Sequence, residues 1–459
     1  MKRLLICLFT NICCICVFAQ MQRYNPNFQI RHIGSSNQQP VNITQPPKNN
    51  TLFSLWEKLG GETTYFCDTI PIEIEDNQVY VRVLIDGQSY RFNIDTGSSQ
   101  GMLFPNAHRP SAIHQLSTPL GNIVSRDANY HLDTVRVVQL PPFRIPLLNN
   151  TQQPTPNTQE LEISHYVASL MPRPALNNKY DAIIGFDLFN RGLCAKIDAG
   201  QGIMILTNNR RAFQEEERQG YTVKYKLKWF VPYLLVSPFV RHTDEALFDL
   251  GSQQLYTMNK QSYDQHLEDD LSKLNKNLGA DIQRQTEGRA FGQLAIAGHG
   301  AEKKDEVAFL RLDRLKFADF AFRDLRAITT QGASRIGAEI LNYGAIIINP
   351  FRRQISFLPY NNTDNIEVSN KPFQVAFVPT SSQRLSSPHG AVAVGLIWEK
   401  SEVYKAGMRQ GDIILQIDQQ PILSFRDFTQ FRFVRGESHR FRMLDSNGKE
   451  KIVECVIKP

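Results

Sequence analysis

One pattern that occurs twice constrains this sequence of 459 residues more than any other feature. Residues 92–98 read FNIDTGS and residues 246–252 read ALFDLGS, so each is an apolar strand that ends in an aspartate, one further residue, a glycine and a serine. Farther along, residues 183–189 read IIGFDLF and residues 335–341 read RIGAEIL. The distance from aspartate to glycine is 90 residues in the first copy (185 − 95) and 88 in the second (337 − 249). Because matched landmarks at matched spacings indicate an internal repeat, the sequence predicts two homologous units.

The two units are expected to be β lobes that cover residues 70–210 and 221–360. Apolar residues in them mostly alternate with polar ones or form short runs between turn residues. Residues 79–94 read VYVRVLIDGQSYRFNI, two such segments joined by Asp-Gly, which predicts a β-hairpin. The clearest helix candidate is residues 261–275. The sequence therefore predicts a mainly β fold with few, short helices.

The first residues have the composition of an export signal. Lys2 and Arg3 precede the apolar run 4–18, and the small residue Ala19 follows it. This order predicts a signal peptide over 1–19 that is cleaved near Ala19, and export to the periplasm or the extracellular space. A membrane anchor is the alternative, but the run is shorter than the ~20 residues that span a bilayer. No membrane span is expected in the mature chain.

Residues 20–69 are expected to form a flexible N-terminal segment. Within them, residues 34–50 are rich in Asn, Gln, Pro and Ser and lack apolar periodicity. A propeptide is the alternative function for this segment. Similar composition predicts a surface loop at residues 149–158 and an interdomain linker at residues 361–372.

Cysteines and charge exclude several function classes. Four of the seven cysteines lie in the predicted signal, which leaves Cys67, Cys194 and Cys455. Three widely spaced cysteines form neither a disulfide framework nor a metal site, although one bridge remains possible. The net charge of +6 falls to +4 without the two basic residues of the signal (6 − 2), and the charges are interspersed. No metal and no nucleic-acid partner are therefore expected.

The repeated motifs resemble those of the aspartic peptidases, in the two-lobed pepsin-like layout with lobes as compact as the retropepsin type. The resemblance rests on the Asp-Thr-Gly and Asp-Leu-Gly turns at residues 95–97 and 249–251 and on the strands that end near Gly185 and Gly337. It implies a bilobal β-barrel fold in which each lobe supplies one catalytic aspartate. The catalytic residues would then be Asp95 and Asp249.

The chemistry of such a pair follows from charge repulsion. Two carboxyl groups about 3 Å apart cannot both ionise, so they share one proton and present a base and an acid together. The base takes a proton from water while the acid supplies one to the peptide carbonyl. The resemblance implies no cofactor, and a monomer suffices because one chain supplies both acids. The residues expected to support the pair are Thr96, Gly97, Ser98, Gly251 and Ser252. The glycines would let the backbone turn sharply and approach the substrate closely, and the serines would donate hydrogen bonds to the carboxylates.

One residue departs from the family pattern and keeps other functions open. Leu250 stands where the family has a hydroxyl residue that bonds across the lobe interface. A lost buried hydrogen bond costs on the order of 1 to 3 kcal/mol if its partner stays unsatisfied. The alternatives are an ordinary turn at Asp95, a non-catalytic peptide-binding protein descended from an aspartic peptidase, and a ligand-binding β protein without that ancestry.

The resemblance also implies flaps, which are hairpins that fold over the substrate. The candidates are residues 120–140, which include Tyr130, and residues 291–300. His299 lies in the second candidate and is expected to be an exposed loop residue rather than a catalytic one.

Residues 373–459 have the length of a further α+β domain. Residues 406–414 read AGMRQGDII, which resembles the turn and strand of PDZ domains that are appended to bacterial proteases. This resemblance implies that the domain binds a peptide or a C-terminus as an added strand, with residues 373–378 near the carboxylate-binding loop. A bracing role is the alternative. Together the patterns predict an exported aspartic endopeptidase that acts on polypeptides.

Overall fold

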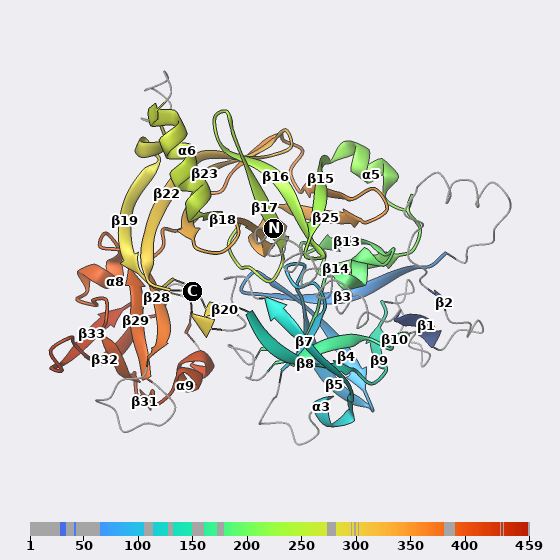
Figure 1. The fold of residues 1–459 in the computed structure, drawn as a ribbon, viewed down its shortest axis with the longest axis horizontal. Helices are drawn as coiled ribbons and strands as arrows, with labels where there is room; N and C mark the ends of the chain where they lie inside the picture. Colours follow the sequence, from blue (N-terminus) through green and yellow to red (C-terminus); the bar gives the residue numbers. More distant parts are fainter. Residues whose placement is uncertain are drawn as a thin grey trace, which may run out of the picture.

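The structure is a computed structural model, and it is mainly β (Figure 1). Its described residues are 28–33, 41–42, 65–104, 113–126, 132–148, 160–171, 179–272, 281–294, 296–297, 300–301, 303–380, 391–431, 433–434 and 436–457. Over these residues, the strands form a 25-stranded network, a six-stranded sheet near the C-terminus and a two-stranded pair. A search of the same residues for a helix long and apolar enough to cross a membrane found none.

Several sequence-based predictions fall outside the described residues. These are the signal peptide at 1–19, most of the segment 34–50 and the loop at 149–158. Part of the segment predicted to be flexible does form strands, β1 (Gln29–Ile33) and β2 (Val41–Asn42). β1 pairs with β10 (Glu160–Ser164), and Ile30 is fully buried. The prediction missed this because a single short apolar strand surrounded by polar residues carries little periodicity.

The first half of the network runs from β3 to β14. β3, β4 and β5 form an antiparallel run; β12 then pairs with β5 in parallel and with β6 antiparallel. β6 pairs in parallel with β11, β11 pairs antiparallel with β8, and β8 forms a hairpin with β7. The strands are β3 (Cys67–Glu75), β4 (Gln78–Ile85), β5 (Gln88–Ile94), β6 (Gly101–Leu103), β7 (Thr118–Arg126), β8 (Leu132–Gln139), β9 (Phe143–Pro146), β11 (Val167–Leu170), β12 (Ala182–Ile184), β13 (Cys194–Asp198) and β14 (Ile203–Thr207).

The second half repeats these pairings in the same sense. β15, β16 and β17 form the antiparallel run; β24 pairs with β17 in parallel and with β18 antiparallel. β18 pairs in parallel with β23, β23 pairs antiparallel with β22, and β22 forms a hairpin with β19. The strands are β15 (Tyr221–Lys228), β16 (Val231–Phe239), β17 (His242–Asp249), β18 (Tyr256–Asn259), β19 (Thr286–Gly292), β20 (Ile296–Ala297), β21 (Gly300–Ala301), β22 (Asp305–Phe317), β23 (Phe320–Thr330), β24 (Arg335–Gly337), β25 (Gly344–Asn349), β26 (Gln354–Pro359) and β27 (Asn365–Glu367).

The two halves are joined through their last hairpins. β13 pairs with β14 and β25 pairs with β26, and β13 and β25 then pair with each other antiparallel. The apolar side chains of both halves form one continuous core, with Phe92, Ile197, Phe248 and Ile348 fully buried in it. This shared sheet and core fix how the two halves sit, and so they fix the distance between the two aspartate turns.

Helices are short and lie between the strands. The hairpin predicted at residues 79–94 is confirmed, and its turn residues Asp86 and Gly87 have φ of 49° and 74°. The helix predicted at residues 261–275 is also observed over most of that range. Helices described in the two halves include α3 (Ile113–Leu116), α4 (Asp187–Asn190), α5 (Gln214–Gln219), α6 (Lys260–Ser272) and the 3-10 helix η1 (Ala338–Asn342).

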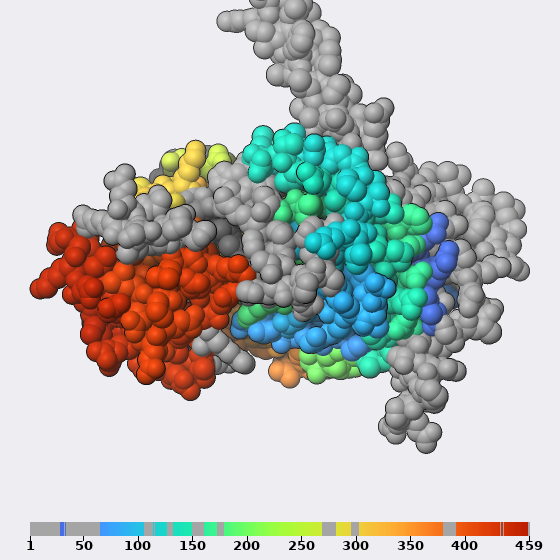
Figure 2. All heavy atoms as spheres, turned by 90° about the horizontal axis from the view of Figure 1, so that it is seen from below, coloured from blue at the N-terminus to red at the C-terminus, as the bar shows by residue number. Residues whose placement is uncertain are grey.

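The C-terminal residues form a separate sheet with its own core, at one end of the molecule (Figure 2). Gly407 and Gly411, with φ of 106° and 84°, shape the turns between its first helix and the following strand. The elements are β28 (Val375–Thr380), β29 (Ala391–Ile397), α8 (Glu402–Lys405), β30 (Ile413–Ile417), β31 (Gln420–Pro421), α9 (Phe425–Gln430), β32 (His439–Leu444) and β33 (Glu450–Cys455).

Candidate functional site

Asp95 sits in a tight turn at the end of β5. Its backbone amide donates to Ile184 O at 3.0 Å, so the parallel strand β12 holds the start of the turn. The Gly97 amide donates to Asp95 Oδ1 at 2.8 Å, and the Ser98 amide donates to Asp95 O at 3.2 Å. The turn therefore fixes the carboxyl group through its own backbone.

Asp249 is the last residue of β17 and occupies the same kind of turn. It lies opposite Gly337 in the parallel ladder with β24. The Gly251 amide donates to Asp249 Oδ1 at 3.0 Å, and the Ser252 amide donates to Asp249 O at 3.0 Å. The two aspartates are thus held by matched backbone contacts.

The fold brings the two turns face to face. A Cβ atom placed on Gly97 would stand 2.5 Å from Cγ of Asp249, and one placed on Gly251 would stand 2.5 Å from Cγ of Asp95. Each glycine therefore makes room for the carboxyl group of the opposite turn. The two carboxyl groups are close enough to hydrogen-bond to each other.

Burial and charge act together on the proton of this pair. The pKa of Asp95 is raised well above its usual value, first by burial, then by the Asp249 charge and its hydrogen bond, against the opposing Gly97 and Ser98 amides. Asp249 is buried, whereas Asp95 keeps part of its surface exposed. A carboxyl group beside a second carboxylate retains its proton more readily, so the arrangement favours one proton shared by two acids.

Thr96 ties the first turn to the second half. Its hydroxyl donates to Phe248 O at 2.7 Å and accepts from the Leu250 amide at 2.9 Å. Leu250 is fully buried in the apolar core. The leucine lacks the hydroxyl for a reciprocal bond, but its own amide is satisfied by Thr96. The departure noted in the sequence therefore leaves one side of the cross-connection in place.

The hydroxyl of Ser98 acts differently from the prediction. Ser98 Oγ donates to Gln100 O at 2.6 Å rather than to a carboxylate, because the turn directs the hydroxyl toward the following strand. Ser252 contributes its backbone carbonyl, which accepts from the Ala338 amide at 2.8 Å. The prediction that the serine hydroxyls hold the carboxylates is wrong for Ser98. Spacing alone does not say where a serine hydroxyl points.

Two polar residues of the first half support the second turn, and no local sequence pattern indicates either of them. Gln78 Nε2 donates to Gly251 O at 3.0 Å, and its Oε1 accepts from the Tyr80 hydroxyl at 2.8 Å. Asn77 Nδ2 donates to Gln253 O at 3.1 Å. These bonds cross between segments more than 170 residues apart, |i−j| being 173 and 176. They hold the Asp249 turn against the first half.

A basic residue stands beside the pair and was also missed. Nε of Arg335, the first residue of β24, lies 3.7 Å from Oδ2 of Asp249. Both side chains are 11% exposed, so solvent screens their interaction weakly. The repeat aligns Arg335 with Ile183. A basic residue at a strand position that is apolar in the other copy is the sequence signal that indicates Arg335.

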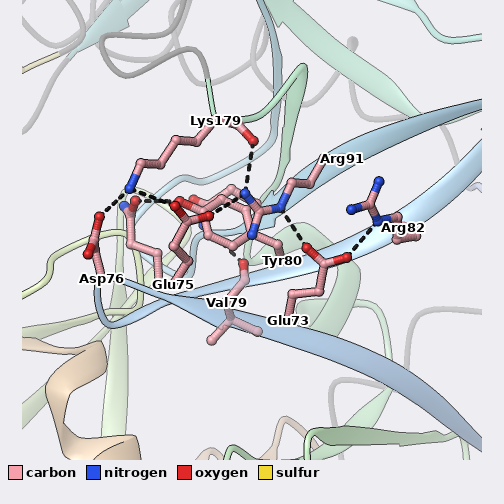
Figure 3. A network of polar contacts seen from close by, with 10 residues as sticks. Glu73, Glu75, Asp76, Val79, Tyr80, Arg82, Arg91 and Lys179 are labelled. Carbon is pink, nitrogen blue, oxygen red and sulfur yellow. Dashed lines mark hydrogen bonds and ion pairs between the residues drawn. The ribbon is translucent and has the colours of Figure 1, made fainter. Parts of the chain in front are cut away.

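The segment that leads into β12 is anchored by an ion-pair network (Figure 3). Lys179 pairs with Asp76 and, at 3.0 Å, with Glu75. Arg91 pairs with Glu75 at 2.6 Å, and its guanidinium lies 3.8 Å from the centre of the Tyr80 ring. Exposed pairs of this kind contribute little stability one by one, but a network fixes side-chain positions.

Tyr180 follows Lys179 and brings a phenol toward the site. Its pKa is raised, first by burial and then by the charges of Asp95 and Tyr80. Its ring packs edge-on against Phe104 with centroids 5.4 Å apart. A neutral phenol beside Asp95 can act as a hydrogen-bond donor or acceptor near a bound ligand.

The described residues offer no cluster of His, Cys, Asp or Glu that could hold a metal ion. The three cysteines left outside the predicted signal, Cys67, Cys194 and Cys455, are all free.

For the flap candidates, β7 and β8 form a hairpin within residues 120–140, but Tyr130 lies outside the described residues. His299 also lies outside them.

The second flap candidate begins in a strand that contacts the C-terminal sheet. The Gln293 amide donates to Gly395 O at 3.0 Å, and Gln410 Nε2 donates to Phe291 O at 2.7 Å. A small apolar cluster that includes Phe309, Leu396 and Trp398 fills the contact. Residues 291–293 are therefore held by the C-terminal sheet.

Comparison with known proteins finds little similarity. No protein-family model matches the chain, and no curated protein matches it. Among solved structures, basic 7S globulin from soybean is similar at 8% sequence identity and a TM-score of 0.36, over 64% of this chain and 95% of that chain. Conglutin gamma, a basic 7S globulin from lupine seeds, is similar at 8% identity and a TM-score of 0.38, over the same shares. A likeness this weak carries no argument about fold or activity.

These findings overturn the family assignment made from the sequence. The resemblance to aspartic peptidases with a C-terminal PDZ domain is contradicted by these comparisons: no family model matches the chain, and the two solved structures are basic 7S globulins. The motifs behind the resemblance are short, and Asp and Gly recur wherever a strand ends in a tight turn. The chemistry of the site depends on its own residues and geometry rather than on a family name.

Proposed function

We propose that the chain is an exported endopeptidase that hydrolyses peptide bonds with a water molecule activated by Asp95 and Asp249. The observation that carries the proposal is the reciprocal approach of the two turns, in which Gly97 and Gly251 each lie against the carboxyl group of the opposite turn. Two carboxyl groups that share a proton supply a general base and a general acid in one site. The reaction needs no cofactor.

The reaction moves protons in a closed cycle. The ionised carboxylate takes a proton from water as the water oxygen bonds to the peptide carbon, and the protonated carboxyl gives its proton to the carbonyl oxygen. In the second step the C–N bond of this tetrahedral intermediate breaks. The first carboxyl protonates the leaving nitrogen while a hydroxyl of the intermediate returns a proton to the second carboxylate. The pair ends as it began, with one proton.

The surroundings of Asp95 suit the protonated partner. Its pKa is held well above the usual value by burial and by the neighbouring carboxylate, so it keeps a proton to donate. Thr96 and Gln78 keep the turns from moving apart, through their bonds to Leu250 and Gly251. A rigid mutual position of the acids is what acid–base catalysis requires.

The proposal extends to architecture and location. The two halves would act as two lobes of a bilobal β-barrel arrangement, with the C-terminal α+β sheet recruiting peptide or regulating the site. One chain supplies both carboxyl groups, so a monomer would be active on a polypeptide substrate. The basic and apolar N-terminal sequence supports export with cleavage near Ala19.

The test is cleavage of an unfolded, fluorescently labelled protein mixture by the full chain across a range of pH. Asp95→Asn and Asp249→Asn should each lower the cleavage rate by on the order of 10²-fold or more, because each removes one proton carrier. Asp313→Asn, in an exposed ion pair with Arg284, is the matched control and should keep the rate. Cleavage that persists in Asp95→Asn would show that this pair is not its source.

A non-catalytic peptide-binding protein is the second candidate, and Leu250 is the observation that favours it. The leucine gives the second turn no hydroxyl with which to bond across the halves. In that case the wild-type chain would bind unfolded polypeptides and release them intact. Equilibrium binding with mass analysis of the recovered polypeptide separates this outcome from hydrolysis.

A further inference from the structure

The strands that pass beside the two aspartate turns carry different residues at the same register. Ile183 of β12 lies opposite the residue two positions before Asp95. Arg335 of β24 lies opposite the residue two positions before Asp249. The two halves therefore match in backbone at this register. The first half carries the isoleucine Ile183 there, and the second half carries the arginine Arg335.

The contact of Arg335 is directional. Its Nε lies 3.7 Å from Oδ2 of Asp249, whereas Oδ1 of Asp249 accepts from the Gly251 amide at 3.0 Å. The two oxygens of Asp249 thus face a cation and an amide. Both contacts favour the ionised form of this carboxyl, and an opposite charge within 4–6 Å does so strongly when solvent is excluded.

Other charged groups near Arg335 are directed elsewhere. On β17, Asp244 accepts from the Tyr256 hydroxyl at 2.6 Å, and Glu245 pairs with Lys228. Tyr256 belongs to β18, the other neighbour of β24, and its hydroxyl donates to Asp244 rather than to the pair. In η1, Glu339 accepts from the Leu255 amide at 2.7 Å. Within the described part of the chain, the contact of Arg335 with Asp249 brings the charge of β24 to the pair.

The first half presents no such cation to Asp95 in the part of the chain that the structure describes. Ile183 is buried at the matched position. Burial and then the charge of Asp95 raise the pKa of Tyr180, so its phenol stays neutral. The two acids are thus alike in backbone and unlike in charge environment.

We propose that Arg335 decides which acid carries the charge: it holds Asp249 ionised, as the base, and leaves the shared proton on Asp95, as the acid. This assignment rests on the proposed function for its catalytic meaning, but the charge state can be measured without any catalysis. Arg335 is a positioning residue, because it acts through Asp249. A cation at this distance from Asp249 stabilises negative charge on either member of the pair.

The test is a titration of the full chain labelled with ¹³C at the aspartate carboxyl carbons, with Asp95→Asn and Asp249→Asn to assign the signals. In wild type, Asp249 should ionise before Asp95 as the pH rises. Arg335→Met should raise both apparent pKa values by about one to three units, and Arg335→Lys should raise them less, because it keeps the charge. If Arg335→Met fails to fold, Arg335→Gln takes its place.

A matched control removes the same charge elsewhere. Arg311 pairs with Asp324 on the exposed face of β22 and β23, and Arg311→Met should leave both values in place. Ionisation of Asp95 first, or apparent pKa values that do not move in Arg335→Met, would overturn the assignment. In the cleavage assay, the pH profile of Arg335→Met should shift upward by the same amount. A wild-type chain that cleaves nothing would remove the proposed function, while the titration would still decide the charge assignment.

Discussion

The two aspartate turns share a backbone but not their side-chain surroundings. In each turn the glycine amide donates to the aspartate, at 2.8 Å for Asp95 and 3.0 Å for Asp249. The middle residue is a buried threonine in the first turn and a buried leucine in the second. The backbone therefore places the carboxyl groups, while the middle residue decides which hydrogen bonds connect the two halves.

A second difference lies just after each strand that passes the turns. Asp187 begins α4, is buried and accepts from the Tyr166 hydroxyl at 2.8 Å. Its counterpart, Glu339 in η1, accepts instead from the backbone amide of Leu255 at 2.7 Å. The same position in the repeat thus carries an acid in both halves, and each half satisfies it with different donors.

The strongest test of the shared backbone is to fill the space at either glycine. In Gly97→Ala or Gly251→Ala the added Cβ would stand 2.5 Å from the opposite carboxyl carbon, so the acids must move apart. Small displacements of catalytic groups can cost ~10²-fold in rate, and we expect losses of that order in both variants. Cleavage assays measure the rate, and Gly87→Ala, in the hairpin turn at φ 74°, is the control for backbone strain alone. A large loss in only one variant would break the symmetry.

The next test concerns the middle residues. Thr96→Val should leave both Phe248 O and the Leu250 amide without their partner, at a cost of about 2 to 4 kcal/mol in the free energy of unfolding. Leu250→Thr should also destabilise, by about 2 kcal/mol, because it removes buried apolar volume. Urea unfolding measures both changes. If Leu250→Thr instead raises the free energy of unfolding, the hydroxyl that the second turn lacks matters more to stability than the packing of the leucine.

The buried acids predict a pH dependence of stability. Burial is the main cause that raises the pKa of Asp187 to about 7, against the opposing effects of Tyr166 and Arg191. Between about pH 4 and pH 7 the folded chain keeps a proton that the unfolded chain releases, so this residue makes stability fall as the pH rises. In Asp187→Asn, the free energy of unfolding should fall by a few kcal/mol less over this pH range than in the wild type. Denaturant unfolding at several pH values measures it, and an unchanged slope would refute the assignment.

The matched variant in the second half is Glu339→Gln. Burial raises the pKa of Glu339 as well, opposed by the Leu255 amide and the Tyr343 hydroxyl. The expected change has the same sign as for Asp187→Asn. Opposite signs in the two halves would show that the matched acids differ in more than their donors.

Local patterns predicted much of the fold. The alternation around Asp86 and Gly87 predicted the hairpin of β4 and β5, because positive φ at both turn residues suits Asp-Gly. The repeat predicted that two distant aspartates follow matched strands, and the structure brings them together. These features were readable since each depends on neighbours in the sequence or on the alignment of two copies.

The rest depended on contacts that no local pattern encodes. Gln78 supports Gly251 from 173 positions away, and nothing around Gln78 in the sequence indicates that partner. Ser98 was assigned to the wrong acceptor because spacing does not fix where its hydroxyl points. Short turn motifs also suggested a family that the comparisons contradict. Arg335 was readable in principle, as the charged residue in an apolar column of the repeat.

The smallest expected effect concerns the outer hairpins of the two halves. The hairpin of β7 and β8 pairs with β11, whereas β19 of the matching hairpin also meets the C-terminal sheet, where the Gln293 amide donates to Gly395 O. Gly292 lies so close to Gly395 and Gln410 that a Cβ there would fall inside contact distance of both. Gly292→Ala should therefore loosen this contact by about 1 kcal/mol.

Hydrogen exchange is the measurement for that change. Exchange at the Gln293 amide should speed up several-fold in Gly292→Ala, while the amides of β13 and β25 keep their protection. Asn122→Ala, on the exposed side of the matching strand β7, is the control and should leave Gln293 unchanged. If Gly292→Ala instead changes exchange at β13 and β25, the C-terminal sheet stabilises the junction of the two halves rather than one hairpin. The difference between the two hairpins would then not be confined to the contact at Gln293.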